Sequence, residues 1–228
     1  MHQPMSCVAA CLVVLGVLAT PAVADCSDRL APGVDWSGCP KEKLMLGGAE
    51  LMEATLAGVF MSGSDLRGAD LTDADLQLSE LVRTSFAGAN LTGANLEKVL
   101  ASRADFSGAM MVGTRLVKAE FQRVNFQSAD LAGADLSDGV FARNDFSGAK
   151  LTGAKLNEAI LSRALFVGAD LSGADLTDAF LSKARIEGVD LTTATGLVQA
   201  QVDMACGDAG TKLPAGLTAP ATWPCPTD

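Results

Sequence analysis

The sequence predicts an all-β fold: a solenoid with four sides to each coil and a short capping helix near its C-terminus. The first observation is a five-residue period. An apolar residue, usually Leu, recurs at every fifth position from Leu46 to Leu191 without a slip in register, Ala101 being the one weak member. The second observation is segregation at a twenty-residue step, with Leu at every fourth unit from Leu56 to Leu176. Another such column reads Leu66, Phe86, Phe106, Phe126, Phe146, Phe166 and Ile186.

A five-residue period fits a chain that bends once in every repeat. Five residues advance the side-chain direction by about 500° on an α-helix, and on a flat strand they place successive leucines on opposite faces. The unit at residues 89–93, Ala-Asn-Leu-Thr-Gly, holds turn-forming residues: Asn or Asp bonds to turn backbone, and Gly accepts turn dihedral angles. Four bends close a coil of about twenty residues, and such coils stack at about 4.8 Å.

This pattern resembles the pentapeptide-repeat family over residues 46–193. The resemblance implies a right-handed quadrilateral β-helix for that segment. It does not assign an activity, because the roles known for this family are diverse. Some cytoplasmic members resemble duplex DNA in shape and charge and act on DNA gyrase, so a DNA mimic is one function that the resemblance implies.

The N-terminal residues 1–24 are typical of a secretory signal peptide. Residues 8–18 form an apolar run too short to cross a bilayer, and an A-x-A cleavage motif at residues 22–24 precedes Asp25. The residues before the run contain no Lys or Arg, and lipoprotein processing at Cys11 is an alternative that leaves almost no apolar segment. We expect a periplasmic or secreted protein without stable membrane insertion.

Four cysteines remain after removal of that peptide: Cys26, Cys39, Cys206 and Cys225. An oxidising compartment favours disulfides, and four cysteines allow three pairings. Their positions favour Cys26–Cys39 within an N-terminal cap (residues 25–45) and Cys206–Cys225 within a C-terminal cap (residues 194–228). A metal site is the alternative, but no close C-x-x-C pair is present, and we expect no metal or other cofactor.

Each cap closes one open end of the repeat segment. In the C-terminal cap we expect a short amphipathic helix at residues 197–206, ended by Gly207. Trp36 and Trp223, which are the only tryptophans, lie in the two caps, where packing over the coil ends is their expected role.

The composition does not favour an enzyme. The single histidine, His2, lies in the signal peptide, and the chain has no tyrosine. Most aspartates occupy the turn position of a repeat, where capping of the backbone explains them. Sequence motifs for nucleotide binding or a serine nucleophile are absent. A carboxylate-based hydrolase is therefore only a remote alternative.

Outward positions on one face of the coil offer the candidate binding residues. Two residues after the apolar centre, this face repeats a positive charge, the cation column: Arg83, Arg103, Arg123, Arg143, Arg163 and Lys183. One residue before the centre, the same face is often apolar, and these residues form the apolar strip: Phe60, Leu100, Val140, Ile160 and Phe180. Glu80 and Glu120 interrupt the strip. Asp105 and Asp145 are expected to compensate part of the like-charge repulsion within the cation column.

Other columns alternate in sign, for example Asp130–Lys150–Asp170 and Asp135–Lys155–Asp175, and are expected to form surface ion pairs. The formal net charge of −10 disfavours nucleic acid and anionic membranes as partners. The sequence therefore favours a non-enzymatic exported scaffold or binding protein. Its partner would be a protein or an anionic envelope polymer held against the cation column and the apolar strip. Coverage of that face by a terminal segment, or by a second copy in a homodimer, is the structural alternative.

Overall fold

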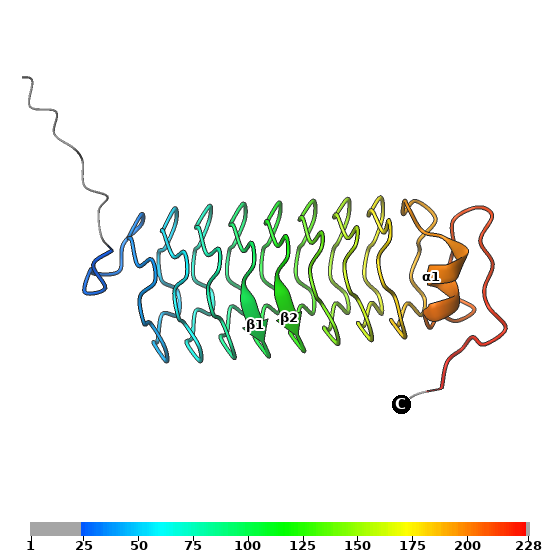
Figure 1. Cartoon of the computed structure of the whole chain (residues 1–228), viewed down its shortest axis with the longest axis horizontal. Helices are drawn as coiled ribbons and strands as arrows, with labels where there is room; N and C mark the ends of the chain where they lie inside the picture. Colours follow the sequence, from blue (N-terminus) through cyan, green and yellow to red (C-terminus); the bar gives the residue numbers. More distant parts are fainter. Residues whose placement is uncertain (1–23, 227–228) are drawn as a thin grey trace, which may run out of the picture.

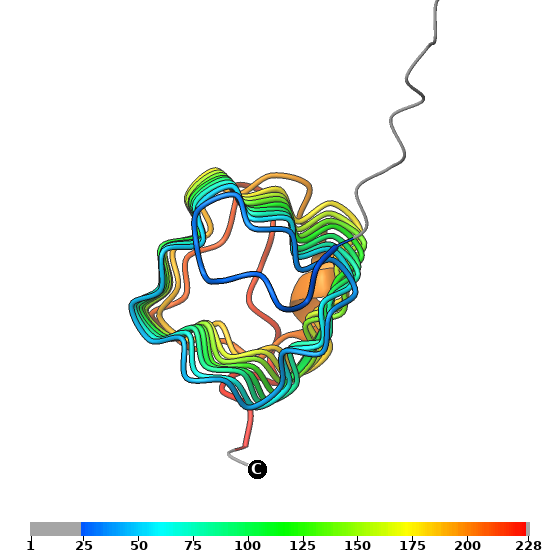
Figure 2. The same cartoon turned by 90° about the vertical axis from the view of Figure 1, so that its left-hand side faces the viewer.

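The computed structural model describes residues 24–226, and the predicted signal peptide lies outside them except for Ala24. The chain forms a straight rod of stacked coils (Figure 1). Viewed along the axis, successive coils superimpose as a four-sided outline (Figure 2). Parallel bridges join residues twenty positions apart on every side, for example Asp75↔Asn95 and Val140↔Ile160. The predicted four-sided β-solenoid with twenty-residue coils is confirmed.

The strands are very short because the backbone turns after every few residues. Within residues 24–226, only β1 (Leu100–Ser102) and β2 (Glu120–Gln122) extend over three residues, and they pair in parallel with Leu100 opposite Glu120. From Gly48 to Gly188, each corner places the residue two positions after an apolar centre in the left-handed region, as at Gly133 (φ 65°) and Asp138 (φ 59°). Glycine is frequent there because it has no Cβ to oppose this conformation.

The interior is a continuous stack of buried centres. Phe86, Phe106, Phe126, Phe146 and Phe166 lie one above another, with neighbouring ring centroids 4.8–5.4 Å apart. This confirms the phenylalanine column expected from the sequence. Phe121 and Phe141, on the adjoining side, pack against this stack.

The N-terminal end is closed by the Cys26–Cys39 disulfide and by a lysine inside the coil. Lys41 and Trp36 occupy inward positions, and the Lys41 Nζ lies 3.7 Å from the centroid of the Trp36 ring and donates to the Cys26 carbonyl at 2.8 Å. Burial lowers the pKa of Lys41, against the opposing effect of nearby carboxylates. The bridges begin at Asp35↔Thr55, so the coil register extends before the expected start at residue 46. The centres of these first units are Trp36 and Lys41 instead of leucine, so the leucine period in the sequence does not reveal where the coils begin.

The C-terminal end is closed by α1 (Gln199–Met204), which lies over the last coils. The buried Gln201 donates from Nε2 to the carbonyls of Leu176 and Ala179, at 2.7 and 2.9 Å. The helix is two residues shorter at each end than the predicted residues 197–206. Beyond it the chain returns to the coil and bridges to Arg185 and Asp190.

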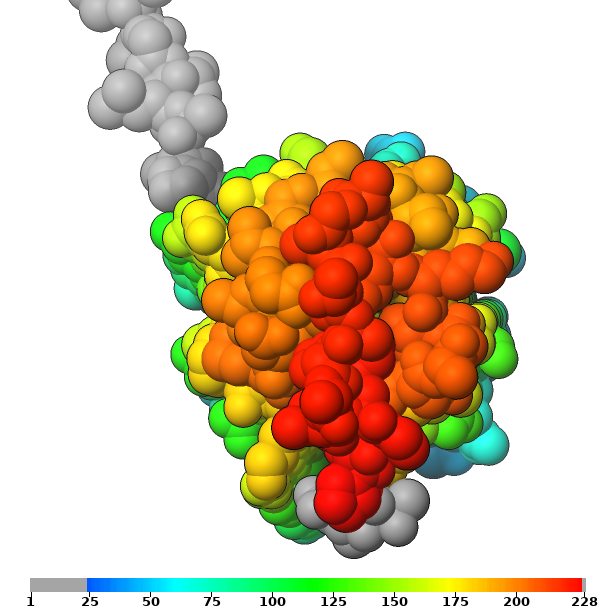
Figure 3. All heavy atoms as spheres, turned by 90° about the vertical axis from the view of Figure 1, so that its right-hand side faces the viewer, coloured from blue at the N-terminus to red at the C-terminus, as the bar shows by residue number. Residues whose placement is uncertain are grey.

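The tail then crosses the end of the rod (Figure 3). The Cys206–Cys225 disulfide fastens it, and Trp223 donates from Nε1 to the Ala205 carbonyl at 2.7 Å. Both disulfides thus match the predicted pairing. Among the described residues, no helix is long and apolar enough to span a membrane.

Candidate ligand-binding face

The cation column lies along one corner of the rod, with one exposed positive side chain per coil. All of its members have a left-handed backbone, with φ between 56° and 60°. A side chain in this conformation costs roughly 1–2 kcal/mol, which glycine avoids. The next column, at the corner five residues later, is mostly glycine, including Gly148, Gly168 and Gly188. The backbone therefore does not require arginine at these corners.

Within residues 24–226, no member of the cation column forms an ion pair or a side-chain hydrogen bond. The compensation expected from Asp105 and Asp145 is not observed. Asp105 accepts from Asn125 Nδ2 at 3.0 Å, and Asp145 accepts from the Ser147 N–H at 2.9 Å and from a Gln127 side-chain N–H. The cation column therefore keeps its donors directed to solvent.

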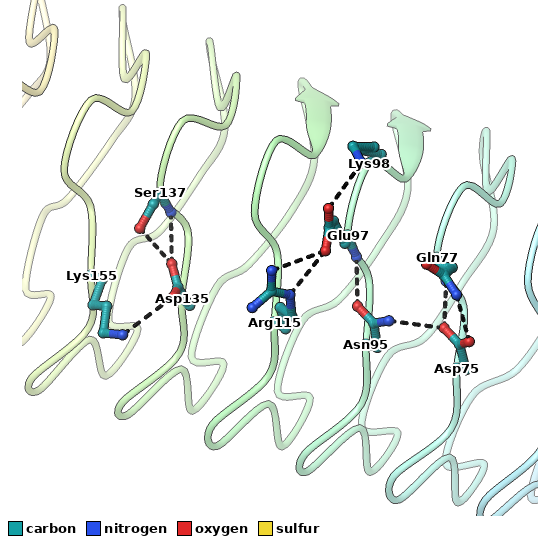
Figure 4. A network of polar contacts seen from close by, with 9 residues as sticks. All are labelled: Asp75, Gln77, Asn95, Glu97, Lys98, Arg115, Asp135, Ser137 and Lys155. Atoms are coloured by element: carbon teal, nitrogen blue, oxygen red, sulfur yellow. Dashed lines mark hydrogen bonds and ion pairs between the residues drawn. The ribbon is translucent and has the colours of Figure 1, made fainter.

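Several cations elsewhere on the rod are paired. Arg115 binds Glu97 at 3.0 Å, and Lys150 and Lys155 each reach the aspartate one coil earlier, at 3.4 Å. Figure 4 shows two of these contacts, together with the Asp75–Asn95 link between coils. The predicted ladders are thus present as the pairs Asp130–Lys150 and Asp135–Lys155, but the pairs to Asp170 and Asp175 are not formed.

A groove of about 510 Å³ follows the first part of the cation column. Its charged wall consists of Arg83, Arg103, Arg123 and Arg143, and its floor is made by the residue before each arginine: Val82, Ser102, Gln122 and Ala142. We call this the arginine groove. Coils stack at about 4.8 Å, so its four arginines extend over about 14 Å of the rod.

The last two members of the cation column, Arg163 and Lys183, line a different cavity of about 430 Å³ at the C-terminal end. Leu165, Met204 and the tail around Cys225 provide its other walls. The sequence could not separate these two sites, because the tail reaches the column only in the folded chain.

The apolar strip lies on the same face and is exposed to solvent. Exposed fractions are 44% for Phe60, 46% for Leu100, 40% for Ile160 and 46% for Phe180, whereas Val140 is half-buried. The described termini do not cover it. Sequence reasoning missed the opposite edge of this face, where Asp138, Glu158 and Asp178 occupy left-handed corners. Each of these acids lies two residues before a member of the apolar strip, and this regular spacing could have identified them from the sequence.

Carboxylates on the other sides of the rod accept hydrogen bonds within the turns. Asp190 accepts from the Thr192 hydroxyl and from Lys212, which hold its pKa at about 2. Hydrogen bonds from the Arg67 side chain and backbone likewise hold the pKa of Asp65 at about 2. Within the described residues, no three His, Cys, Asp or Glu side chains are grouped so as to hold a metal ion.

Several solved structures are similar to this chain. The HetL pentapeptide repeat protein of the cyanobacterium Nostoc, involved in heterocyst differentiation regulation, is 28% identical over 83% of this chain and 93% of its own, with a TM-score of 0.49. The plasmid-mediated fluoroquinolone resistance protein QnrB1 is 24% identical over 76% of this chain and 91% of its own, with a TM-score of 0.42. A comparison with curated proteins gives no match.

The family comparison covers the solenoid itself. The profile for pentapeptide repeats matches eight copies, over residues 49–86, 79–117, 119–158 and 154–192. The matched segments contain most of the corners and buried centres and the whole cation column, and the family fold is a right-handed quadrilateral β-helix. The chain therefore belongs to the pentapeptide-repeat family.

Proposed function

We propose that this protein is a non-enzymatic exported scaffold that binds an elongated anionic ligand along the arginine groove. The ligand class is an anionic envelope polymer or the acidic surface of a partner protein. The observation that supports this proposal most strongly is that four arginines line one groove and form no ion pair within the described chain. Export is supported by the predicted signal peptide and by a disulfide in each cap.

The electrostatics of the groove favour a long ligand. Like charges on successive coils repel one another, and an anion that spans several coils replaces this repulsion by attraction. The arginines project from rigid corners of a stacked backbone, so binding costs little backbone ordering. Arginine also presents a planar set of donors that matches carboxylate and phosphate groups. A linear polyanion thus gains contacts on every coil that it crosses.

The alternative of a DNA mimic acting on gyrase agrees with the net charge of −10 and with the rod shape. A duplex mimic presents negative charge along its surface, whereas one corner of this rod carries six successive cations. Export by the predicted signal peptide would also separate the protein from gyrase. Supercoiling by gyrase should therefore be unaffected by a large excess of the protein.

Binding to polygalacturonate, a linear polymer with one carboxylate per sugar, tests the proposal by calorimetry. The variant Arg83→Gln/Arg103→Gln/Arg123→Gln should lose at least ten-fold in affinity, and the wild-type affinity should fall as salt is added. Arg67→Gln/Lys150→Gln/Lys155→Gln makes the same change in net charge on other sides and should bind like wild type. Equal losses in both variants, or no binding by the wild type to this polymer or to polyphosphate, would refute the proposal.

A further inference from the structure

The C-terminal half of the candidate face has a distribution of charge that extends beyond the arginine groove and shares only Arg143 with it. Three successive coils carry an acid at one corner, an apolar side chain between the corners and a base at the other corner. The sets are Asp138–Val140–Arg143, Glu158–Ile160–Arg163 and Asp178–Phe180–Lys183. The apolar members bridge one another in parallel, so each of the three types forms a straight line along the rod.

Neither charged edge is neutralised by an ion pair within the described chain. The three acids and the three bases are exposed, and none of them forms an ion pair or a side-chain hydrogen bond among residues 24–226. Ile160 and Phe180 between them are 40% and 46% exposed. An apolar line between an unpaired acidic edge and an unpaired basic edge is the composition of an interface, with a desolvated centre and a charged rim.

Symmetry identifies a partner for this face. If a second copy is rotated by two-fold symmetry about an axis parallel to the rod, its acidic edge comes to lie against the basic edge of the first copy. The two apolar lines then meet beside the axis. A two-fold axis perpendicular to the rod, lying in the interface, would instead oppose acid to acid and base to base, which is repulsive. Only the parallel arrangement is complementary at both edges.

We propose that this protein forms a parallel, side-by-side homodimer through Asp138–Lys183, with the two rods aligned coil for coil. The second copy has the same spacing between coils, about 4.8 Å, so every charge pair stays in register along the interface. In the dimer, Asp138 lies opposite Arg143, Glu158 opposite Arg163 and Asp178 opposite Lys183 of the second copy. The interface is isologous, as in most dimers of soluble proteins.

The same reasoning limits the dimer to the C-terminal half. In earlier coils the corresponding corner carries Lys98 and Lys118, which would face Arg103 and Arg123 of a parallel copy. These like charges repel and keep the N-terminal halves apart, so most of the arginine groove stays accessible. Three coils bury less area than a permanent dimer requires, and the association is therefore reversible. This inference does not depend on the proposed function.

A charge-swap experiment tests the pairing by sedimentation over a range of concentrations. Arg143→Glu/Arg163→Glu/Lys183→Glu makes both edges acidic, and Asp138→Lys/Glu158→Lys/Asp178→Lys makes both edges basic. Each variant alone should be monomeric where the wild type dimerises, and an equal mixture of the two should dimerise again. Lysine and glutamate already occupy such corners at Lys118 and Glu158, so both variants should keep the circular dichroism of the wild type.

Cross-linking tests the orientation. In a parallel dimer, Val140→Cys lies next to the same residue of the second copy, and the same holds for Phe180→Cys. Each variant should therefore form a disulfide-linked dimer with itself. A wild type that stays monomeric at all concentrations, variants that still dimerise alone, or cross-links that form only between Val140→Cys and Phe180→Cys would overturn the proposal. Asp138→Lys/Glu158→Lys/Asp178→Lys keeps all four arginines of the groove, so loss of dimerisation with retained polyanion binding in that variant would leave the proposed function intact.

Discussion

Phe126 stacks on Phe146 with ring centroids 4.9 Å apart and ring planes 2° from parallel. On its other side, Phe126 meets Phe106 at 5.4 Å, so each ring lies between the rings of the coils before and after it. The stack therefore couples neighbouring coils through the centre of the rod. Phe180, in contrast, lies on the outside and is 46% exposed.

Truncation in the stack should destabilise the rod strongly. Phe126→Ala should lower the free energy of unfolding by about 3–5 kcal/mol, because a ring is lost from a fully packed interior and a cavity remains. Phe180→Ala removes the same atoms from the surface and should change it by less than about 1 kcal/mol. Urea unfolding measures both changes. Similar losses in the two variants would contradict this account of the core.

Glycine in the cation column should separate stability from binding. Arg123 has φ 56°, and Arg123→Gly removes the cost of a side chain in the left-handed region. After the entropy of glycine in the unfolded chain is deducted, a gain of about 0.5–1 kcal/mol is expected. Affinity for polygalacturonate should fall in the same variant. Thermal unfolding and calorimetry measure the two effects, and a less stable variant would argue against a strained corner.

Removal of the C-terminal disulfide should loosen one end of the rod only. Cys206 and Cys225 are 19 residues apart, and closing a loop of this size is worth about 3 kcal/mol. In Cys206→Ala/Cys225→Ala, hydrogen exchange should accelerate at residues 197–226, because solenoid coils contact only their neighbours. Exchange at the central coils is the internal control. Uniform acceleration along the rod would show that the end cap stabilises the whole chain.

Acid should destabilise the protein between about pH 4 and pH 2. The pKa of Asp65 and that of Asp190 are both held at about 2, by hydrogen bonds from Arg67 and from Thr192 and Lys212 respectively. An aspartate in the unfolded chain titrates near 3.9. Ionisation of these carboxylates therefore stabilises the fold above that pH, and the contribution is lost as the pH falls towards 2.

Thermal melts from pH 5 to pH 2 measure this loss. In Asp65→Asn/Asp190→Asn the melting temperature should fall less over that window, because two of the titrating groups are absent while an amide oxygen still accepts the turn N–H. A melting temperature that falls equally in the variant and the wild type would assign the acid sensitivity to other carboxylates.

The sequence by itself determined the architecture of this protein. A five-residue period with a fixed register, and a phenylalanine column at a twenty-residue step, left a four-sided coil as the solution that buries all the centres together. The cysteine positions likewise predicted both disulfides, because each pair lies at one end of the repeat segment. These features are local or strictly periodic, and a period can be read without coordinates.

The tertiary structure decided where that period begins and what the surface offers. Lys41 and Trp36 lie inside the first coils because each contacts the other and the N-terminal segment, which a search for leucine centres cannot detect. The unpaired state of the arginines and their division between a groove and a terminal cavity depend on side-chain directions and on the path of the tail. The acidic edge at Asp138 faces the same side as Arg143 only because the backbone turns a corner at each of them. Contacts between residues distant along the chain exist only once the coils are stacked, and the candidate site is made of such contacts.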